Sequence, residues 1–377
     1  MRYIGNKTKL LDFIGARLAH LGIRGGRALD AFAGTATVGA FLKTRGFTVM
    51  TSDVMTYSYV FQRAYVVADH YPAFRALRAD AAVEAALRHP VLRAAATDRM
   101  PDAAPPAARR LAQELVYLDT MVDGERGFIT HNFSDGSRAQ RTYFTRDNAG
   151  RIDAIRRTLH EWRASRLVGE TEFFLLLASL IEAADTVANT TGVYAAYVKS
   201  WQSNARRPLR LKLPLVGARG AGAGRCRAFL GDASRAIVEA GALDVLYLDP
   251  PYNTRQYSGY YHVPELLARG WFDGDLPALR GKTGLILNRD DQRSDWSSRS
   301  RCVGALETLL AGANARHVLL SYNNEGIIPA ADIRRALRAY GQAHTYRCFS
   351  RHYRRYRADT RAYSADSTVE YLHYVSQ

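Results

Sequence analysis

The feature that most constrains the fold is an apolar run, residues 243–248, that stops at two prolines. Its sequence, Leu-Asp-Val-Leu-Tyr-Leu, has the length and apolar content of a buried parallel strand. Proline lacks a backbone N–H and restricts the residue before it, so Pro250 and Pro251 end the hydrogen bonding of that strand. The run therefore predicts an α/β sheet with Asp249 and Tyr252 at its carboxyl edge, where open sheets bind ligands.

The tetrapeptide Asp249-Pro-Pro-Tyr252 suits the methylation of an exocyclic amine on a nucleobase. Such an amine is a weak nucleophile, because its lone pair is delocalised into the ring. The Asp249 carboxylate and the Pro250 carbonyl would accept its two hydrogens and leave the lone pair facing a methyl donor. Tyr252 would stack on a base that has left the duplex. The alternative is an ordinary Pro-Pro turn in which Asp249 is only a turn residue.

A second strand, loop and helix are predicted near the amino terminus. Residues 27–34, which include Asp30-Ala-Phe-Ala-Gly34, form a strand-like segment that runs into the small-residue turn Thr35-Ala-Thr-Val-Gly39, and a helix is expected over 40–44. Residues 47–53 predict another strand, which ends in an acid that commonly accepts hydrogen bonds from ribose. The glycine pattern of a dinucleotide fold is absent, as is the Gly-Lys-Ser/Thr of a phosphate loop. The loop therefore favours a cofactor without a pyrophosphate.

Three segments in this order resemble the alpha-group, Dam-like DNA adenine-N6 methyltransferases: Met1–Leu11, Asp30–Gly34 and Asp249–Tyr252. The extension over 253–262 is similar to the modification methylases of restriction systems, the FokI-type branch included. The resemblance implies a Rossmann-like, S-adenosylmethionine-dependent methyltransferase fold. It also implies methyl transfer to the N6 of adenine in a specific sequence of double-stranded DNA, by base flipping and direct transfer.

The resemblance also implies roles for single residues. Asp249, Pro250, Pro251 and Tyr252 would form the catalytic turn. The residues that would hold S-adenosylmethionine are Tyr3, Lys7, Asp30, Phe32, Gly34, Thr35, Asp53 and Asp232. Among them Lys7 would meet the methionine carboxylate, Asp53 the ribose and Asp232 the adenine amino group of the cofactor.

One residue departs from the family pattern. Ala36 stands where the family usually has glycine. Because a Cβ disfavours positive φ, the turn after Gly34 is not expected to enter that region freely. The shape of the cofactor loop is therefore left open.

The middle of the chain predicts a mainly helical insertion between the second and third strands of the sheet. Residues 74–118 are predicted to form helices. A buried helix is predicted over residues 172–181, and a further helix over residues 193–201. We expect a catalytic domain of residues 1–60 and 225–377. Residues 61–224 would then form an inserted target-recognition domain, as in the resembling family.

Charge and composition favour a polyanionic partner. The excess of 52 Lys+Arg over 36 Asp+Glu gives a net charge of +16, which suits double-stranded DNA and salt-dependent binding. The alternative is arginine enrichment by a GC-rich genome. The candidate DNA-binding residues are Arg2, Arg138, Arg141, Arg255, Tyr257, Tyr260, Arg351, Arg354, Arg355 and Arg357. The sequence predicts a turn-rich loop over residues 130–138, which carries Arg138 and is followed by Arg141. A solvated loop fits this segment equally well, and Tyr257 and Tyr260 fit ordinary packing.

The sequence also predicts several absences. No apolar run is long enough to span a membrane, and the amino terminus lacks a secretory h-region. Three cysteines without metal-like spacing, Cys226, Cys302 and Cys348, predict no metal site and a cytoplasmic protein with reduced thiols. The resemblance makes a restriction endonuclease a candidate functional partner.

Three other functions compete with this interpretation. Cytosine-N4 methylation of DNA presents the same amine chemistry, although Asp rather than Ser at position 249 favours adenine. A catalytically inactive DNA-binding relative would keep the fold, but the intact Asp-Pro-Pro-Tyr argues against it. A small-molecule dehydrogenase is disfavoured by the missing glycine pattern.

Overall fold

The computed structural model describes residues 1–377 except 103, 275, 288–289 and 355–366. The chain forms two compact units. The sheet unit comprises Gly5–Gln62, Gly217–Ser258 and Arg289–Gln377, and the helical unit comprises Met1–Ile4, Arg63–Val216 and Gly259–Asn288. These units differ from the predicted domains mainly in the segment after residue 258, which the sequence assigns to the catalytic domain and which folds with the helical unit.

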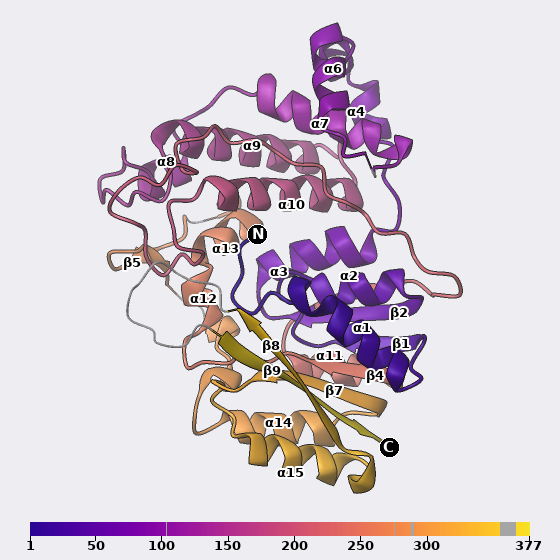
Figure 1. The fold of residues 1–377 in the computed structure, drawn as a ribbon. Helices are drawn as coiled ribbons and strands as arrows, with labels where there is room; N and C mark the ends of the chain where they lie inside the picture. Colours follow the sequence, from indigo (N-terminus) through magenta and orange to yellow (C-terminus); the bar gives the residue numbers. More distant parts are fainter. Residues whose placement is uncertain (103, 275, 288–289, 355–366) are drawn as a thin grey trace. The chain divides into compact units, whose positions relative to one another are not determined.

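A mostly parallel sheet forms the centre of the sheet unit, in the order β3-β2-β1-β4-β7-β9-β8 (Figure 1). Its strands are β1 Gly26–Asp30, β2 Phe47–Asp53, β3 Arg227–Leu230, β4 Leu243–Leu248, β7 Ala315–Asn323, β8 Arg347–Arg354 and β9 Ser367–Ser376. Strand β9 runs antiparallel between β7 and β8, and the other pairings are parallel. The predicted Rossmann-like α/β fold is confirmed, and β2 and β4 match their predicted bounds.

Helices cover both faces of this sheet. They are α1 Leu11–His20, α2 Thr37–Thr44, α3 Thr56–Phe61, α11 Ala233–Ala240, α14 Cys302–Ala311 and α15 Ala330–Tyr340. The buried side chains Ile237, Leu306 and Ile333 share one core with Leu246 and Val318 of the strands. Helices α11, α14 and α15 therefore lie on one face, and α1 to α3 lie on the other (Figure 1). The short segments are η1 Thr8–Leu10, η4 Asp290–Gln292, η5 Asp295–Ser297 and η6 Ala343–Thr345.

The helical unit includes Arg63–Val216, which is most of the insertion predicted over residues 61–224. Its elements are α4 Arg75–Ala79, α5 Ala81–Leu87, α6 Pro90–Asp98, η3 Pro106–Ala108, α7 Arg109–Thr120, α8 Phe128–Phe133, α9 Arg146–Ala164, α10 Glu170–Val187, α13 His262–Arg269 and the short strands β5 Leu279–Arg280 and β6 Leu285–Ile286. Two elements cross the unit boundaries, the π-helical turn η2 Gln62–Val67 and the helix α12 Tyr257–Tyr260. None of the described helices has the length and apolar character that crossing a membrane requires.

Two predictions for this unit are wrong. Residues 193–201 form turns, bends and irregular chain rather than a helix. Gly192 takes a φ of 113°, and Asn189 exchanges backbone and side-chain hydrogen bonds with Val198, so the chain closes into a loop. The segment expected as a loop from Thr130 is helical as far as Phe133, because α8 begins at Phe128 and the Asp153 carboxylate accepts the backbone N–H groups of its first turn.

Candidate active site

The catalytic turn and the first loop lie at one edge of the sheet. The strand order reverses between β1 and β4, which are neighbours, so their carboxyl ends form the switch point where α/β sheets bind ligands. In the register of this pair Asp30 lies opposite Tyr247, two residues before Asp249. The two predicted motifs therefore meet, although more than two hundred residues separate them in the sequence.

Lys7 lies in a buried polar cluster at the catalytic turn. Its Nζ atom is 3.0 Å from Asp249 Oδ1, 3.1 Å from Glu370 Oε1 and 2.8 Å from Tyr252 Oη. An ammonium group has three N–H donors, so these acceptors occupy all of them. The predicted contact between Lys7 and a cofactor carboxylate stays a prediction, and in this structure the side chain holds the catalytic turn.

Tyr252 is fixed through its hydroxyl group. That oxygen is 2.8 Å from Asp249 Oδ1 and 2.6 Å from Glu370 Oε1, and its single proton is donated to one of these acceptors at a time. Ser321 Oγ donates to the same Glu370 oxygen over 2.7 Å. The Tyr252 ring packs edge-on against Tyr322, with ring centroids 4.7 Å apart. The ring orientation is thus determined before any base arrives.

The backbone of the turn is also anchored. Tyr322 donates its hydroxyl hydrogen to the Pro251 carbonyl over 3.4 Å, and Ile327 N–H donates to the Tyr252 carbonyl over 3.1 Å. Within the described part of the chain, the Pro250 carbonyl accepts no hydrogen bond. It therefore remains available as the second acceptor that the sequence assigns to it.

Burial and neighbouring charges set the ionisation of the acids at this edge. Burial raises the pKa of Asp249 to about 6; the Lys7 ammonium opposes the shift and Glu370 adds to it. Burial, followed by the charges of Asp249 and Asp53, raises the pKa of Asp30 to about 7. Burial alone would lower the pKa of Lys7, but Asp249 and Glu370 hold that pKa above its ordinary value. The edge thus gathers negative charge in a poorly hydrated place.

The first loop is shaped by the carboxylates of β1 and β2. Asp53 accepts the Gly34 N–H over 2.9 Å, and Asp30 accepts the Gly39 N–H over 3.0 Å. Ala36 caps α2 with a φ of 59°, so the expectation that its Cβ would keep the turn out of the left-handed region is wrong. The hydrogen bonds on either side of Ala36 impose the conformation that glycine would adopt without strain.

Each of the remaining cofactor candidates has its own contacts in the structure. Thr35 Oγ1 accepts from Asn6 Nδ2 over 3.3 Å, and the Phe32 ring meets Trp296 edge-on, with centroids 4.9 Å apart. Asp232 is exposed and caps α11 through the Ser234 N–H. Tyr3 belongs to the helical unit, where it stacks on Tyr261 with centroids 4.8 Å apart.

Two candidate DNA-binding arginines are engaged inside the helical unit. Arg2 donates to the backbone carbonyls of Asp185, Ala188 and Thr190 over 2.7 to 3.1 Å. Arg141 donates to the carbonyls of Asn132, Gly281 and Lys282 over 3.1 to 3.3 Å. Both guanidinium groups therefore bind backbone carbonyls of the helical unit and hold the segments around them together.

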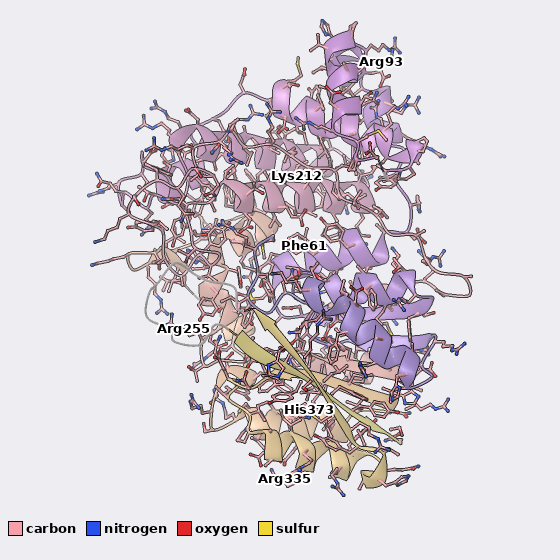
Figure 2. The ribbon with its side chains drawn as sticks, viewed as in Figure 1. Phe61, Arg93, Lys212, Arg255, Arg335 and His373 are labelled. Atoms are coloured by element: carbon pink, nitrogen blue, oxygen red, sulfur yellow. The ribbon has the colours of Figure 1, made fainter. Side chains whose placement is uncertain are left out.

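The other candidates for DNA contact differ in solvent exposure. Arg138, Arg255 and Arg351 are exposed, Tyr257 is half-buried and Tyr260 is buried. Arg354 ends β8, and Arg355 and Arg357 lie outside the described residues. Basic side chains also extend from both units elsewhere, as Arg93 on α6 and Arg335 on α15 show (Figure 2).

Sequence reasoning missed two residues of the cluster, Glu370 and Ser321. Glu370 is 1% exposed on β9, and Ser321 is 2% exposed on β7. The available signal was an isolated acid in the strand-like run 368–375, where a buried carboxylate requires a charged partner. Only the folded structure, in which Lys7 Nζ lies 3.1 Å from Glu370 Oε1, shows that this partner is Lys7.

Comparison with known protein families decides the class. The family model described as D12 class N6 adenine-specific DNA methyltransferase matches residues 3–276. The chain belongs to this family.

Individual relatives agree with the family assignment. The type II methyltransferase M.NlaIII of Neisseria lactamica is 33% identical over 384 residues, which cover 99% of this chain and 98% of that protein. M.FokI of Planomicrobium okeanokoites is 31% identical over all of this chain and 53% of its own length. M.CviAII of Paramecium bursaria Chlorella virus 1 is 27% identical over 99% of this chain and 97% of its own.

The protein is thus a sequence-specific adenine-N6 DNA methyltransferase of the restriction–modification type. The matches support neither cytosine-N4 methylation nor an inactive relative. Among the described residues, no group of three or more His, Cys, Asp or Glu side chains is placed to hold a metal ion.

Proposed function

We propose that this enzyme takes its methyl group from S-adenosylmethionine and transfers it directly to the N6 of an adenine that has left a DNA duplex. The observation that supports this most strongly is the pair of acceptors at the end of β4. The Asp249 carboxylate is held by Lys7, and the Pro250 carbonyl accepts no other bond in the described chain. Two acceptors match the two hydrogens of an exocyclic amine.

The residues at the switch point fit S-adenosylmethionine. Asp30, Asp53 and Asp249 lie close enough that the charges of the other two raise the pKa of Asp30. Asp30 Oδ1 is buried without a hydrogen-bond partner among the described residues. A sulfonium cation is electrostatically favoured in such a place. Gly34, Phe32 and Asp53 would hold the cofactor, which supplies an electrophilic methyl group when bound.

The chain's own groups then position the amine. Asp249 must be ionised to accept both the Lys7 and the substrate hydrogens, and the Lys7 charge favours that state. Tyr252 offers its ring to the extruded base, while its hydroxyl stays bonded to Asp249 and Glu370. The proton of the methylated amine is lost after transfer, so no strong general base is needed.

We further propose double-stranded DNA as the substrate form and a restriction endonuclease as the functional counterpart. The net charge of +16 and the exposed Arg138 and Arg255 support a polyanionic partner. The relatives' type II classification supports the pairing. A cytoplasmic location also stays a prediction.

Nucleoside analysis tests this proposal. Unmethylated duplex DNA is incubated with the enzyme and methyl-labelled S-adenosylmethionine, then digested and separated. We expect the label in N6-methyldeoxyadenosine, at a single sequence context. The same DNA presented as separate single strands is the control for duplex preference. Label in N4-methylcytosine, or no transfer from this donor, would contradict the proposal.

A further inference from the structure

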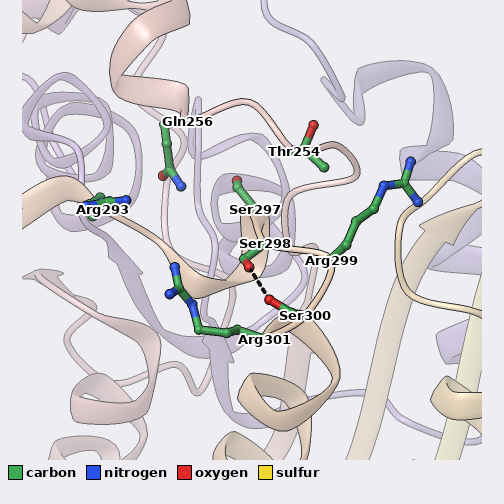
Figure 3. A pocket seen from close by; sticks show the side chains of 8 residues that line it. All are labelled: Thr254, Gln256, Arg293, Ser297, Ser298, Arg299, Ser300 and Arg301. Carbon is green, nitrogen blue, oxygen red and sulfur yellow. Dashed lines mark hydrogen bonds between the residues drawn. The ribbon is translucent and has the colours of Figure 1, made fainter.

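An open hollow of about 540 Å³ lies in the sheet unit beside the segment that follows the catalytic turn (Figure 3). Thr254 and Gln256 of that segment form part of its lining. The rest comes from the stretch before α14, with three arginines, Arg293, Arg299 and Arg301, and serines at 297, 298 and 300. No sequence motif pointed to this stretch.

The chemistry of the lining is that of an anion site. It holds guanidinium, hydroxyl and amide groups and no carboxylate. The side chains of Arg293 and Arg299 are exposed and form no ion pair or hydrogen bond with another described residue. Arg301 pairs with Asp295 over 2.7 Å, so two of the three positive charges remain uncompensated. Arginine with serine and threonine hydroxyls is the usual set of contacts to phosphate oxygens.

Hydrogen bonds join the stretch that lines the hollow to the segment that follows the catalytic turn. Gln256 Nε2 donates to the Ser294 carbonyl over 3.0 Å, and Ser294 N–H donates to Gln256 Oε1 over 2.9 Å. Ser297 Oγ donates to the Arg255 carbonyl over 3.4 Å. Trp296, 3% exposed, anchors the stretch in the core. The backbone that carries these arginines is therefore anchored to the segment that begins four residues before Gln256, at Tyr252.

We propose that this hollow binds one backbone phosphate of the DNA strand, next to the nucleotide whose adenine enters the catalytic turn. Extruding a base rotates its nucleotide about the backbone, so a neighbouring phosphate needs a fixed contact if N6 is to reach Asp249. A site rigidly joined to the Asp249–Gln256 segment supplies that contact. The inference rests on the proposed extrusion of the base from a duplex.

The test combines protein variants with modified DNA. Arg293→Gln/Arg299→Gln is compared with the wild type and with Arg334→Gln, which removes an exposed arginine of α15 away from the hollow. Duplexes containing the modification site carry one uncharged methylphosphonate at a time around the target adenine. Binding is measured at several salt concentrations, and thermal unfolding checks that the variants are folded.

We expect the double variant to bind unmodified duplex about 10-fold or more weakly, with the slope of log K against log salt reduced by about 1. One methylphosphonate should weaken the wild type and Arg334→Gln but leave the double variant unaffected. Wild-type affinity in the double variant overturns the inference, as does a double variant that still responds to every methylphosphonate. Methyl transfer by the wild type is scored separately, so failure of the phosphate site is distinguishable from failure of the proposed function.

Discussion

Burial and two neighbouring residues of opposite charge set the pKa of Asp249. Lys7 lowers its pKa and Glu370 raises it, while burial makes the largest contribution and moves it to about 6. The amino-terminal motif is enough to predict Lys7 as a functional residue. Its partner Glu370 could not be predicted, because Glu370 lies 121 residues after Asp249 in the sequence and reaches Lys7 only in the folded structure. The cluster explains why a lysine is buried beside the catalytic turn.

The charges around Asp249 predict how the kcat/KM of the enzyme falls at low pH. Below a pH of about 6 Asp249 is protonated in the free enzyme, so kcat/KM should fall as the pH falls. Lys7→Met should move the midpoint of that limb to higher pH, because it removes the charge that favours ionised Asp249. Glu370→Gln should move it to lower pH, because it removes a like charge.

The measurement is kcat/KM for DNA between about pH 5 and 8, a range in which a titrating group near pH 6 is visible. Thermal unfolding at each pH separates a loss of fold from a change in titration. Midpoints that shift in the same direction in the two variants, or that do not shift, would rule out Asp249 as the titrating group.

At the scale of elements, the sequence is most informative about strands that are buried along almost their whole length. Strands β2 and β4 were predictable because apolar runs of strand length end at an acid. Residues 193–201 were not, because hydrogen bonds from Asn189 to distant backbone override their helical pattern. The turn at Ala36 shows the same limit, since the carboxylates of Asp30 and Asp53 impose a left-handed conformation that alanine does not favour by itself.

The turn predicts a graded response to substitution at position 36. Ala36→Val should lower the free energy of unfolding by about 2 kcal/mol or more, because a β-branched residue rarely takes positive φ and the site is fully buried. Ala36→Gly should change it by less than about 1 kcal/mol, because relief of left-handed strain is offset by backbone entropy and a lost methyl contact. Urea unfolding measures both. Equal stability of the valine variant and the wild type would show that the turn adopts another conformation.

At the scale of the whole molecule, the sheet unit carries the catalytic turn, the Lys7 cluster and most of the predicted cofactor residues. Motif order was enough to predict the fold class and the family, because Asp30–Gly34 and Asp249–Tyr252 follow strands whose carboxyl ends meet. The buried cluster and the arginine-lined hollow were beyond prediction. Glu370 of the cluster and Arg299 of the hollow belong to no local motif and are brought to their sites by the tertiary structure.

The central claim is that Asp249 acts on the amine during transfer rather than on the fold or on binding. The most direct measurement is the single-turnover rate of methyl transfer by Asp249→Asn with S-adenosylmethionine and duplex DNA both bound at saturation. We predict a rate reduced about 100-fold or more, with the Kd values for donor and DNA changed by less than about 3-fold. A variant that transfers methyl within about 3-fold of the wild-type rate would contradict the account.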